Sequence, residues 1–518
     1  MATNNETPTG SPPPAPAAAA AAAVGDIGEP QELFIDGAYT ASSDGATFPV
    51  YNPMTGAKLY DCASASEADY ARAIEAAAAA SEAWARTGPS ARRLLFLRAA
   101  EILERLMATE APALMSAEVS ATRHWTRVNA VSAVGLLREA AGLASQIKGE
   151  ILPADAPGTT VLVERQPLGV VLAISPWNAP ASLTVRAIAT PLVCGNTVIL
   201  KPSEFSPKNQ HLVVRAMREA GLPRGCLHFL PTSPARTPAA TEFAIKHPLV
   251  RHVNFTGSDR VGRIIAGHAA TCLKRCVLEL GGKAPVIVLD DADLEDAAEA
   301  VAFGALANAG QVCMSTERVI VHAAAAARFT DALLARVRRV AVGDPAEDPG
   351  VSVSGLFTPA SAARVRGLLA DAVAAGARLL CGDGGAPSGP NRTVVAPHVV
   401  DAVTPAMDIW RRESFGPVVC LAAFASDAEA VALANDSDYS LSAAVFSRDV
   451  MRALDVARRV RAGSCHVNNP SVYIAAGTPN GGVGGASGYG RFGGTAGLQE
   501  FTELKIISLG RSGVKYPF

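Results

Sequence analysis

The chain has 518 residues, of which 49% are hydrophobic and 18% are charged, a balance typical of a globular protein large enough for two or three domains. Its 46 basic and 48 acidic residues leave a formal net charge of -2, which predicts neither a basic surface for nucleic acid nor a polybasic patch for membranes. No apolar run approaches the length of a membrane span. We therefore expect small molecules as partners.

The nine cysteines include no CxxC pair, so they indicate neither a secreted disulfide framework nor a zinc site. We expect free thiols in a reducing compartment and no bound metal. The first basic side chain is Lys58, whereas secretory signals and transit peptides carry early positive charge. These features favour the cytoplasm.

Residues 1–30 are rich in Pro, Ala, Thr and Asn, and they bury too little apolar surface to offset their ordering entropy. They predict a disordered tail, with a short helix as the alternative. Order is expected to begin near Glu32, where an apolar triplet followed by Asp36-Gly37 predicts a strand and a hairpin turn. Helical patterns follow from residue 67 to about 86 and from 90 to about 142.

From Val161 onward, short apolar runs alternate with amphipathic segments, a pattern typical of βαβ units and a parallel sheet. The predicted strands are 169–174, 197–200, 227–230, 252–255 and 277–280, and the predicted helices between them include 185–193, 209–221 and 259–270. A second β/α series comprises 286–289, 319–321 and 418–419 and ends near Val467. The sequence thus predicts an α/β fold with two α/β domains.

Cys313 is the candidate nucleophile. It lies after a long helical pattern and before a strand, at a loop end from which a thiol can face a cleft. Most of the other cysteines lie in segments that resemble core strands or helices, where a free cysteine acts as a small hydrophobic residue. A buried, inert thiol is the usual role of a single cysteine, so the assignment of Cys313 depends on the motifs around it.

Glu279 is the candidate general base. It ends an apolar strand, where a charge is costly unless its pKa is raised or it is paired. A general base that works near neutral pH needs such an environment. The alternative is a structural carboxylate paired with Lys283.

Asn178 follows a buried strand directly, in Pro176-Trp177-Asn178, which places an amide donor at the carboxyl edge of the predicted sheet. Such a donor can stabilise a developing oxyanion without ionising, although an isolated Asn after Pro-Trp usually belongs to a turn. The segment 201–204 follows the next strand with a cation and a carboxylate. A carboxylate there can accept from ribose hydroxyls and repels a 2′-phosphate, so it favours NAD and leaves NADP open.

The segment 255–262 combines a strand end, a Gly turn and a helix start, which can hold a pyrophosphate on free amide groups. It lacks the GxGxxG spacing, so alone it is weak evidence.

Together these motifs resemble the aldehyde dehydrogenase superfamily, in the family's order and from about Glu32 to Leu509. The segments that carry the resemblance are 176–178, 201–204, 255–258, 279–283, 310–313 and 413–417. It implies a Rossmann-like NAD-binding domain at 31–144 and 167–280, a catalytic domain at 281–485, and a small β excursion for oligomerisation at 145–166 and 495–512. An edge strand in that excursion would be covered by a partner, which predicts a homodimer or homotetramer.

The resemblance also implies a role for each site residue. Cys313 would be the nucleophile, Glu279 the base that activates water, and Asn178 with the backbone N–H of Cys313 the oxyanion hole. The residues implied in cofactor binding are Trp177, Lys201, Ser203, Glu204, Gly257, Ser258, Gly281, Glu413 and Phe415. The expected reaction is NAD(P)-dependent oxidation of an aldehyde to an acid, through a thioester on Cys313 and without a metal.

Within the superfamily, the segments 166–171, 311–318 and 487–494 resemble the salicylaldehyde and vanillin dehydrogenase branch, which implies an aromatic aldehyde. The small residues Ala179, Ala181 and Ser182 would leave room for a ring. At two positions the sequence differs from these relatives, in segments that we expect at the entrance of the substrate site, here called the substrate mouth. Asn480 stands where relatives usually carry Phe, in a segment that is one residue longer and lacks their lysine, and Ser440 stands where Gly is usual.

Three alternatives stay open at this point. The substrate could be an aliphatic aldehyde or a semialdehyde. A CoA-acylating dehydrogenase would share the nucleophile and the cofactor site, but a water-activating base such as Glu279 is superfluous in that reaction. The third alternative is a non-catalytic protein on the same fold, which the reactivity of Cys313 toward an alkylating agent would test.

Overall fold

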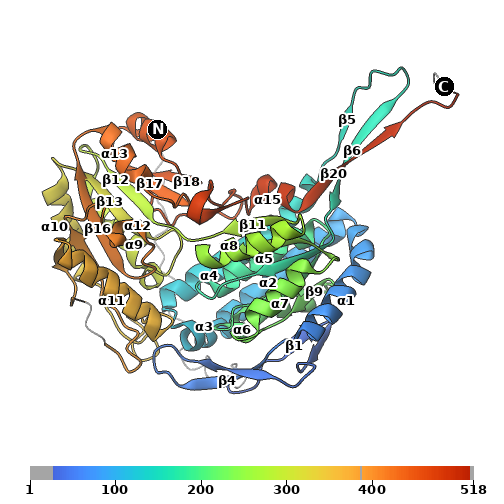
Figure 1. The fold of residues 1–518 in the computed structure, drawn as a ribbon, viewed down its shortest axis with the longest axis horizontal. Coiled ribbons are helices and arrows are strands. Elements are labelled where there is room, and N and C mark those ends of the chain that lie inside the picture. The colour runs from blue at the N-terminus through green and yellow to red at the C-terminus, as the bar shows by residue number, and fades with distance from the viewer. Residues whose placement is uncertain (1–26, 385–387, 514–518) are drawn as a thin grey trace, which may run out of the picture.

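The computed structural model describes residues 27–384 and 388–513, so most of the predicted tail lies outside the described residues. The chain forms two α/β halves, each built on one large sheet, and a three-stranded arm that projects from one side (Figure 1). A two-stranded sheet of β3 (Thr47–Tyr51) and β4 (Lys58–Ala63) lies at the edge of the first half. Among the described residues, no helix has both the length and the apolar character to cross a membrane.

The first sheet has the order β19-β11-β10-β7-β8-β9-β1-β2, and its five central strands are parallel. Its strands are β1 (Leu33–Ile35), β2 (Ala38–Thr40), β7 (Val170–Ile174), β8 (Thr197–Lys201), β9 (Leu227–Phe229), β10 (Val250–Thr256), β11 (Arg275–Glu279) and β19 (Gly488–Tyr489). The predicted hairpin at Asp36-Gly37 is confirmed, because β1 pairs antiparallel with β2 across this turn. The predicted central strands are confirmed to within three residues.

Helices cover both faces of this sheet. They are α1 (Glu67–Ala85), α2 (Pro89–Thr109), α3 (Ala111–Val119), α4 (Arg123–Leu143), α5 (Pro180–Val193), α6 (Pro207–Glu219), α7 (Thr237–Lys246) and α8 (Asp259–Thr271). The alternation of side chains along β7 explains the two layers: Val171 and Ala173 join the core beneath α2, α4, α5 and α6, whereas Leu172 faces α1, α7 and α8.

The helical pattern from 90 to 142 is divided among α2, α3 and α4. Ser120 adopts a left-handed conformation with φ 53°, which ends α3. Thr122 then caps α4, since its hydroxyl accepts from the N–H of Trp125 at 3.2 Å. Apolar periodicity continues across this break, so the pattern alone predicts one long helical region.

The second sheet has the order β14-β15-β16-β13-β12-β17-β18 and is parallel except for β14. Its strands are β12 (Ala284–Val288), β13 (Thr316–His322), β14 (Arg378–Cys381), β15 (His398–Asp401), β16 (Val418–Phe424), β17 (Ser442–Phe446) and β18 (Ser464–Val467). Its helices are α9 (Leu294–Leu306), α10 (Ala326–Val337), α11 (Pro359–Ala374), α12 (Asp408–Arg411), α13 (Asp427–Asn435) and α14 (Val450–Arg459). The series ends at Val467, as predicted.

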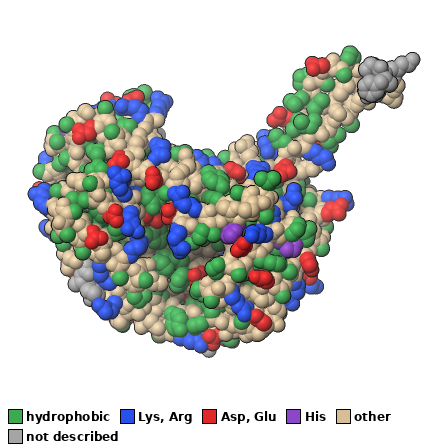
Figure 2. Space-filling view, viewed as in Figure 1, with side chains coloured by type: hydrophobic (Ala, Val, Ile, Leu, Met, Phe, Trp, Pro, Cys, Tyr) green, Lys and Arg blue, Asp and Glu red, His purple; other side chains and the backbone are tan. Residues whose placement is uncertain are grey.

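The arm consists of β5 (Glu150–Leu152), β6 (Thr160–Pro167) and β20 (Thr502–Leu509), with β20 paired antiparallel to β6 along its whole length. Apolar side chains are visible on the arm (Figure 2). Its exposed residues include Ile151 and Ile506, which are 73% and 70% exposed. The preceding helix α15 (Gly494–Glu500) packs against α4 and α5 on the body.

The order of strands in the first sheet reverses at β7. The chain runs from β7 through β8 to β9 on one side and then returns to β10 on the other side. Ile174 pairs with Lys201 and with Phe255, so these strands end at the same edge. In open α/β sheets, ligands bind beyond the carboxyl ends of the strands at such a switch point.

Candidate active site

The loop that carries Cys313 has a constrained backbone. It follows the short helix η3 (Ala307–Gly310), in which Asn308 and Ala309 have φ of 51° and 55°. Gly310 is also left-handed, with φ 74°, and a Cβ there would collide with the carbonyl of Gly416. A glycine is therefore required at this position.

The thiol of Cys313 lies against Glu279 at the carboxyl end of β11. Its Sγ is 3.3 Å from Glu279 Oε1, to which it donates. Burial raises the pKa of the Cys313 thiol to about 11, an effect that the charge of Arg186 partly offsets. The thiol is thus protonated at rest and has an acceptor for its proton in contact with it.

Arg186 was not anticipated from the sequence. It lies on α5, forms an ion pair with Glu279 Oε2, and donates to Thr256 Oγ1 at 3.0 Å. Its guanidinium also lies 4.8 Å from the centre of the Phe492 ring. A lone cation in the apolar stretch of α5 is the same kind of signal that singled out Glu279, so it was available in the sequence.

The alternative that Glu279 is paired with Lys283 is wrong. Lys283 instead forms a buried ion pair with Glu317, and Arg186 is the partner of Glu279.

Hydrogen bonds hold Asn178 against the loop that carries Cys313. Its side-chain Nδ2 donates to the carbonyl of Gln311 at 2.9 Å. Its own carbonyl accepts from Trp125 Nε1 at 2.8 Å and from Asn308 Nδ2 at 3.0 Å. Because an amide carries two N–H donors, one of them stays available to a ligand.

The residues predicted to bind ribose lie at the end of β8. Lys201 Nζ is 3.5 Å from Glu204 Oε2, a loose pair that leaves hydrogen-bonding capacity on both groups. Between them, the N–H of Ser203 donates to Gln210 Oε1 at 2.7 Å, which fixes the turn.

Gly257 and Ser258 lie between β10 and α8, where Gly257 donates its N–H to the carbonyl of Glu279 at 3.1 Å. Ser258 is the N-cap of α8 and accepts from the N–H of Val261 at 3.4 Å. A pyrophosphate is suited to this helix N-terminus.

Aromatic side chains gather between the two halves of the molecule. Trp177 stacks on Phe357 with ring centres 4.1 Å apart, and the rings of Phe205 and Phe415 pack edge-on against Trp177 at 6.5 and 6.0 Å. Trp177 and Phe205 come from the first half, and Phe357 and Phe415 from the second. The cluster thus joins the predicted ribose site to the predicted nicotinamide site.

Glu413 lies beside the turn after β11. Its Oε1 accepts from the N–H of Gly282 at 2.8 Å, and a Cβ at Gly281 would come within 2.8 Å of its Oε2. Burial, with the nearby charge of Glu317, raises the pKa of Glu413 to about 8. These residues fit a dinucleotide: a carboxylate and a cation for one ribose, a helix N-terminus for phosphate, and a carboxyl beside an aromatic ring.

Comparison with known proteins decides the family. The model of the "Aldehyde dehydrogenase family" matches residues 39–507. A vanillin dehydrogenase of a Pseudomonas species is 46% identical over 485 residues, which are 94% of this chain and 99% of that protein. The chain belongs to the aldehyde dehydrogenase family. It is therefore an NAD(P)-dependent aldehyde dehydrogenase, with NAD as the supported cofactor.

Two further relatives resemble this aldehyde dehydrogenase closely. The crystal structure of a salicylaldehyde dehydrogenase from Pseudomonas putida G7, complexed with salicylaldehyde, matches with a TM-score of 0.91 and 42% identity, covering 94% of this chain and 100% of that one. An NAD(+) benzaldehyde dehydrogenase from Pseudomonas putida is 35% identical over 92% of this chain and 95% of that protein. The predicted α/β fold and family are confirmed.

The two departures of this aldehyde dehydrogenase are coupled in the structure. Ser440 Oγ donates to the carbonyl of Gly484 at 2.7 Å and accepts from the N–H of Val483 at 3.1 Å, so it anchors the extended segment. Asn480 is buried and exchanges two backbone hydrogen bonds with Phe492. We expected both departures near the entrance of the substrate site. Asn480 holds the backbone of Phe492, the residue whose ring lies against Arg186.

Among the described residues of this aldehyde dehydrogenase, no three His, Cys, Asp or Glu side chains are grouped so that they could hold a metal ion.

Proposed function

We propose that this protein oxidises aromatic aldehydes to carboxylic acids with NAD, through a thioester on Cys313. The observation that carries the proposal is the contact of Cys313 Sγ with Glu279 Oε1 at 3.3 Å, beside an amide donor on Asn178. The aromatic substrate class rests on the vanillin, salicylaldehyde and benzaldehyde dehydrogenases that resemble the chain at 35–46% identity.

In the first half of the reaction, Cys313 passes its proton to Glu279 and attacks the carbonyl carbon. Negative charge then develops on the aldehyde oxygen. The free N–H of the Asn178 amide and the backbone N–H of Cys313 donate to it. When bound, NAD would accept the hydride whose loss from the aldehyde carbon leaves the thioester. The residues that would hold it are Trp177, Lys201, Ser203, Glu204, Gly257, Ser258, Gly281, Glu413 and Phe415.

Between the two halves, Glu279 releases the proton of Cys313 to solvent. In the second half, Glu279 takes a proton from water, and the hydroxide attacks the thioester carbon and releases the acid. The contact with Arg186 holds the Glu279 carboxylate in place beside the nucleophile. Cys313 leaves as a thiolate and recovers its proton.

We assign a separate role to each half of the molecule. We assign cofactor binding to residues 31–144 and 167–280 and the nucleophile to residues 281–485. The excursion formed by 145–166 and 495–512 is assigned to oligomerisation. The described part of this excursion includes the projecting arm, whose exposed apolar side chains favour burial against another subunit.

We also propose that the protein works in the cytoplasm as a homodimer or homotetramer. Its nine free cysteines suit a reducing compartment. Light scattering tests the oligomer: Ile506→Asp in the arm should yield monomers, whereas Leu273→Asp, at a 93% exposed leucine on the body, should not. Oligomers that persist in Ile506→Asp would contradict the assignment of the arm.

Absorbance of NADH and NADPH with a panel of aromatic and aliphatic aldehydes tests the activity, with Cys313→Ala as the control. The proposal predicts turnover of benzaldehyde-type substrates that needs Cys313 and exceeds that of short aliphatic aldehydes. A preference for aliphatic aldehydes would contradict the substrate class. A requirement for added CoA would favour the acylating reaction instead.

A further inference from the structure

The segment 413–415 carries two of the predicted cofactor contacts, and its backbone is held from both sides. Arg364 on α11 donates to the carbonyl of Glu413 at 2.8 Å and to that of Ser414 at 2.6 Å. On the other side, Glu317 accepts from the N–H of Ser414 at 2.8 Å and from that of Phe415 at 3.2 Å. Two carbonyls and two amides of consecutive residues are thereby satisfied by charged side chains.

The segment needs such support because its backbone is strained. Phe415 has φ 48°, in the left-handed region that bulky residues avoid. A residue in that region persists only where its surroundings over-determine it. The amide of Phe415 on Glu317 and the two carbonyls on Arg364 supply that constraint, and Gly416 and Pro417 follow directly.

Glu317 has a second contact that affects Glu413. It forms an ion pair with Lys283, and the side chains of Glu317 and Lys283 are 3% and 1% exposed. Lys283 directly follows the turn whose Gly282 N–H binds Glu413. Because Glu317 binds Lys283, the cation forms no ion pair with Glu413, whose carboxyl stays beside the predicted nicotinamide site.

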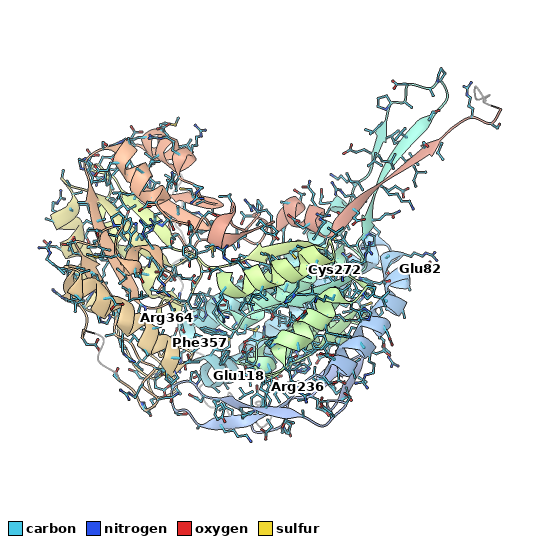
Figure 3. The ribbon with its side chains drawn as sticks, viewed as in Figure 1. Glu82, Glu118, Arg236, Cys272, Phe357 and Arg364 are labelled. Carbon is cyan, nitrogen blue, oxygen red and sulfur yellow. The ribbon has the colours of Figure 1, made fainter. Side chains whose placement is uncertain are left out.

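We propose that Glu317, Lys283 and Arg364 form a clamp that fixes the backbone of residues 413–415 and thereby orients Glu413 and Phe415 toward the cofactor. These three are positioning residues, since they act through the segment they hold. Figure 3 labels Arg364, which lies on α11 in the second half of the molecule. The inference rests on the proposed roles of Glu413 and Phe415 in cofactor binding.

Arg364 offers the cleanest test because its side chain is exposed and its removal leaves no buried charge. Its matched control is Arg366 on the same helix, which donates in the same way to the carbonyls of Arg392 and Val394 and makes no hydrogen bond to the described residues 413–415. NADH binding is measured by fluorescence titration for Arg364→Met and Arg366→Met. The melting temperature and the rate of Cys313 alkylation without cofactor are recorded beside it.

The clamp predicts that Arg364→Met raises the dissociation constant of NADH about tenfold, which corresponds to about 1.4 kcal/mol. Arg364→Lys should restore part of the affinity. Melting temperature and alkylation rate should stay at their wild-type values, and Arg366→Met should bind NADH like the wild type. Wild-type affinity in Arg364→Met, or equal loss in Arg366→Met, would overturn the proposal.

The buried side of the clamp is tested with the double variant Lys283→Met with Glu317→Gln, which removes both charges and so avoids an unpaired buried ion. We expect it to weaken NADH binding at least as much as Arg364→Met does.

Phe415→Ala and Glu413→Gln separate this inference from the proposed function. If both bind NADH like the wild type, the assignment of the segment to the cofactor is wrong. If they weaken binding while the clamp variants do not, only the clamp is wrong.

Discussion

Arg186 and Glu279 form an ion pair inside the protein, with side chains that are 6% and 1% exposed. One oxygen of Glu279 contacts this guanidinium and the other contacts the thiol of Cys313. The base is therefore held between the cation behind it and the nucleophile in front of it. The pair links the stability of the fold to the chemistry of the site.

Removal of Arg186 should be strongly destabilising, because it leaves a buried carboxylate without its partner. We expect Arg186→Met to lower the free energy of unfolding by about 3–5 kcal/mol, measured by urea denaturation. The exposed pair of Arg86 with Glu82 is the control, and Arg86→Met should cost less than about 1 kcal/mol. If the two substitutions lowered the free energy of unfolding equally, the buried pair would contribute no more to stability than the exposed pair.

The pH dependence of thiol reactivity follows from the raised pKa of Cys313. Thiolate forms only as the pH approaches about 11, so the rate of alkylation in the cofactor-free protein should rise about tenfold per pH unit from pH 7 to 10. The charge of Glu413 raises this pKa, so Glu413→Gln should lower it and speed alkylation above pH 8. A plateau reached below pH 9 in the wild type would contradict the raised pKa of Cys313.

Loss of the Asn178 amide should affect the chemical step more than the fold. With one oxyanion donor removed, we expect Asn178→Ala to reduce kcat by about 10²- to 10³-fold. Steady-state kinetics with benzaldehyde measure it, and Asn391→Ala, an amide that donates to the carbonyl of Pro53 far along the chain, is the control. A change confined to the KM of the aldehyde would indicate that Asn178 only shapes the pocket.

Ser440 should stabilise the extended segment near the substrate mouth. Ser440→Gly removes two hydrogen bonds to Val483 and Gly484, so we expect a loss of about 1–3 kcal/mol in the free energy of unfolding. The KM for aromatic aldehydes should rise while the KM for NAD stays constant. If the kinetics for both substrates matched those of the wild type, this segment would not form part of the substrate mouth.

Much of the fold follows from local pattern. Buried strands such as β7 and β8 are runs of Val, Ile and Leu bounded by turn residues, and their spacing predicts the βαβ order. The break between α3 and α4 could not be predicted in the same way. It depends on the left-handed conformation of Ser120, which apolar periodicity does not report.

In the candidate site, too, some residues could be predicted from local sequence pattern and others could not. Cys313 and Glu279 stand out in sequence because each is a reactive group in an apolar setting, and the structure brings them into contact. Arg186, a lone cation in the apolar stretch of α5, gives a similar signal. The role of Glu317 could not be predicted, because its partners Lys283 and Ser414 lie 34 and 97 positions away along the chain.

The central claim is a thioester on Cys313 that Glu279 helps to hydrolyse, and intact-protein mass spectrometry tests it most directly. Glu279→Gln is mixed with NAD and benzaldehyde at pH 10, where part of Cys313 is thiolate without the help of the base, and quenched in acid. The account predicts a burst of about one NADH per subunit and a mass increase of one benzoyl group, absent when Cys313 is also replaced by Ala. No adduct despite NADH formation, or an adduct that survives replacement of Cys313, would contradict it.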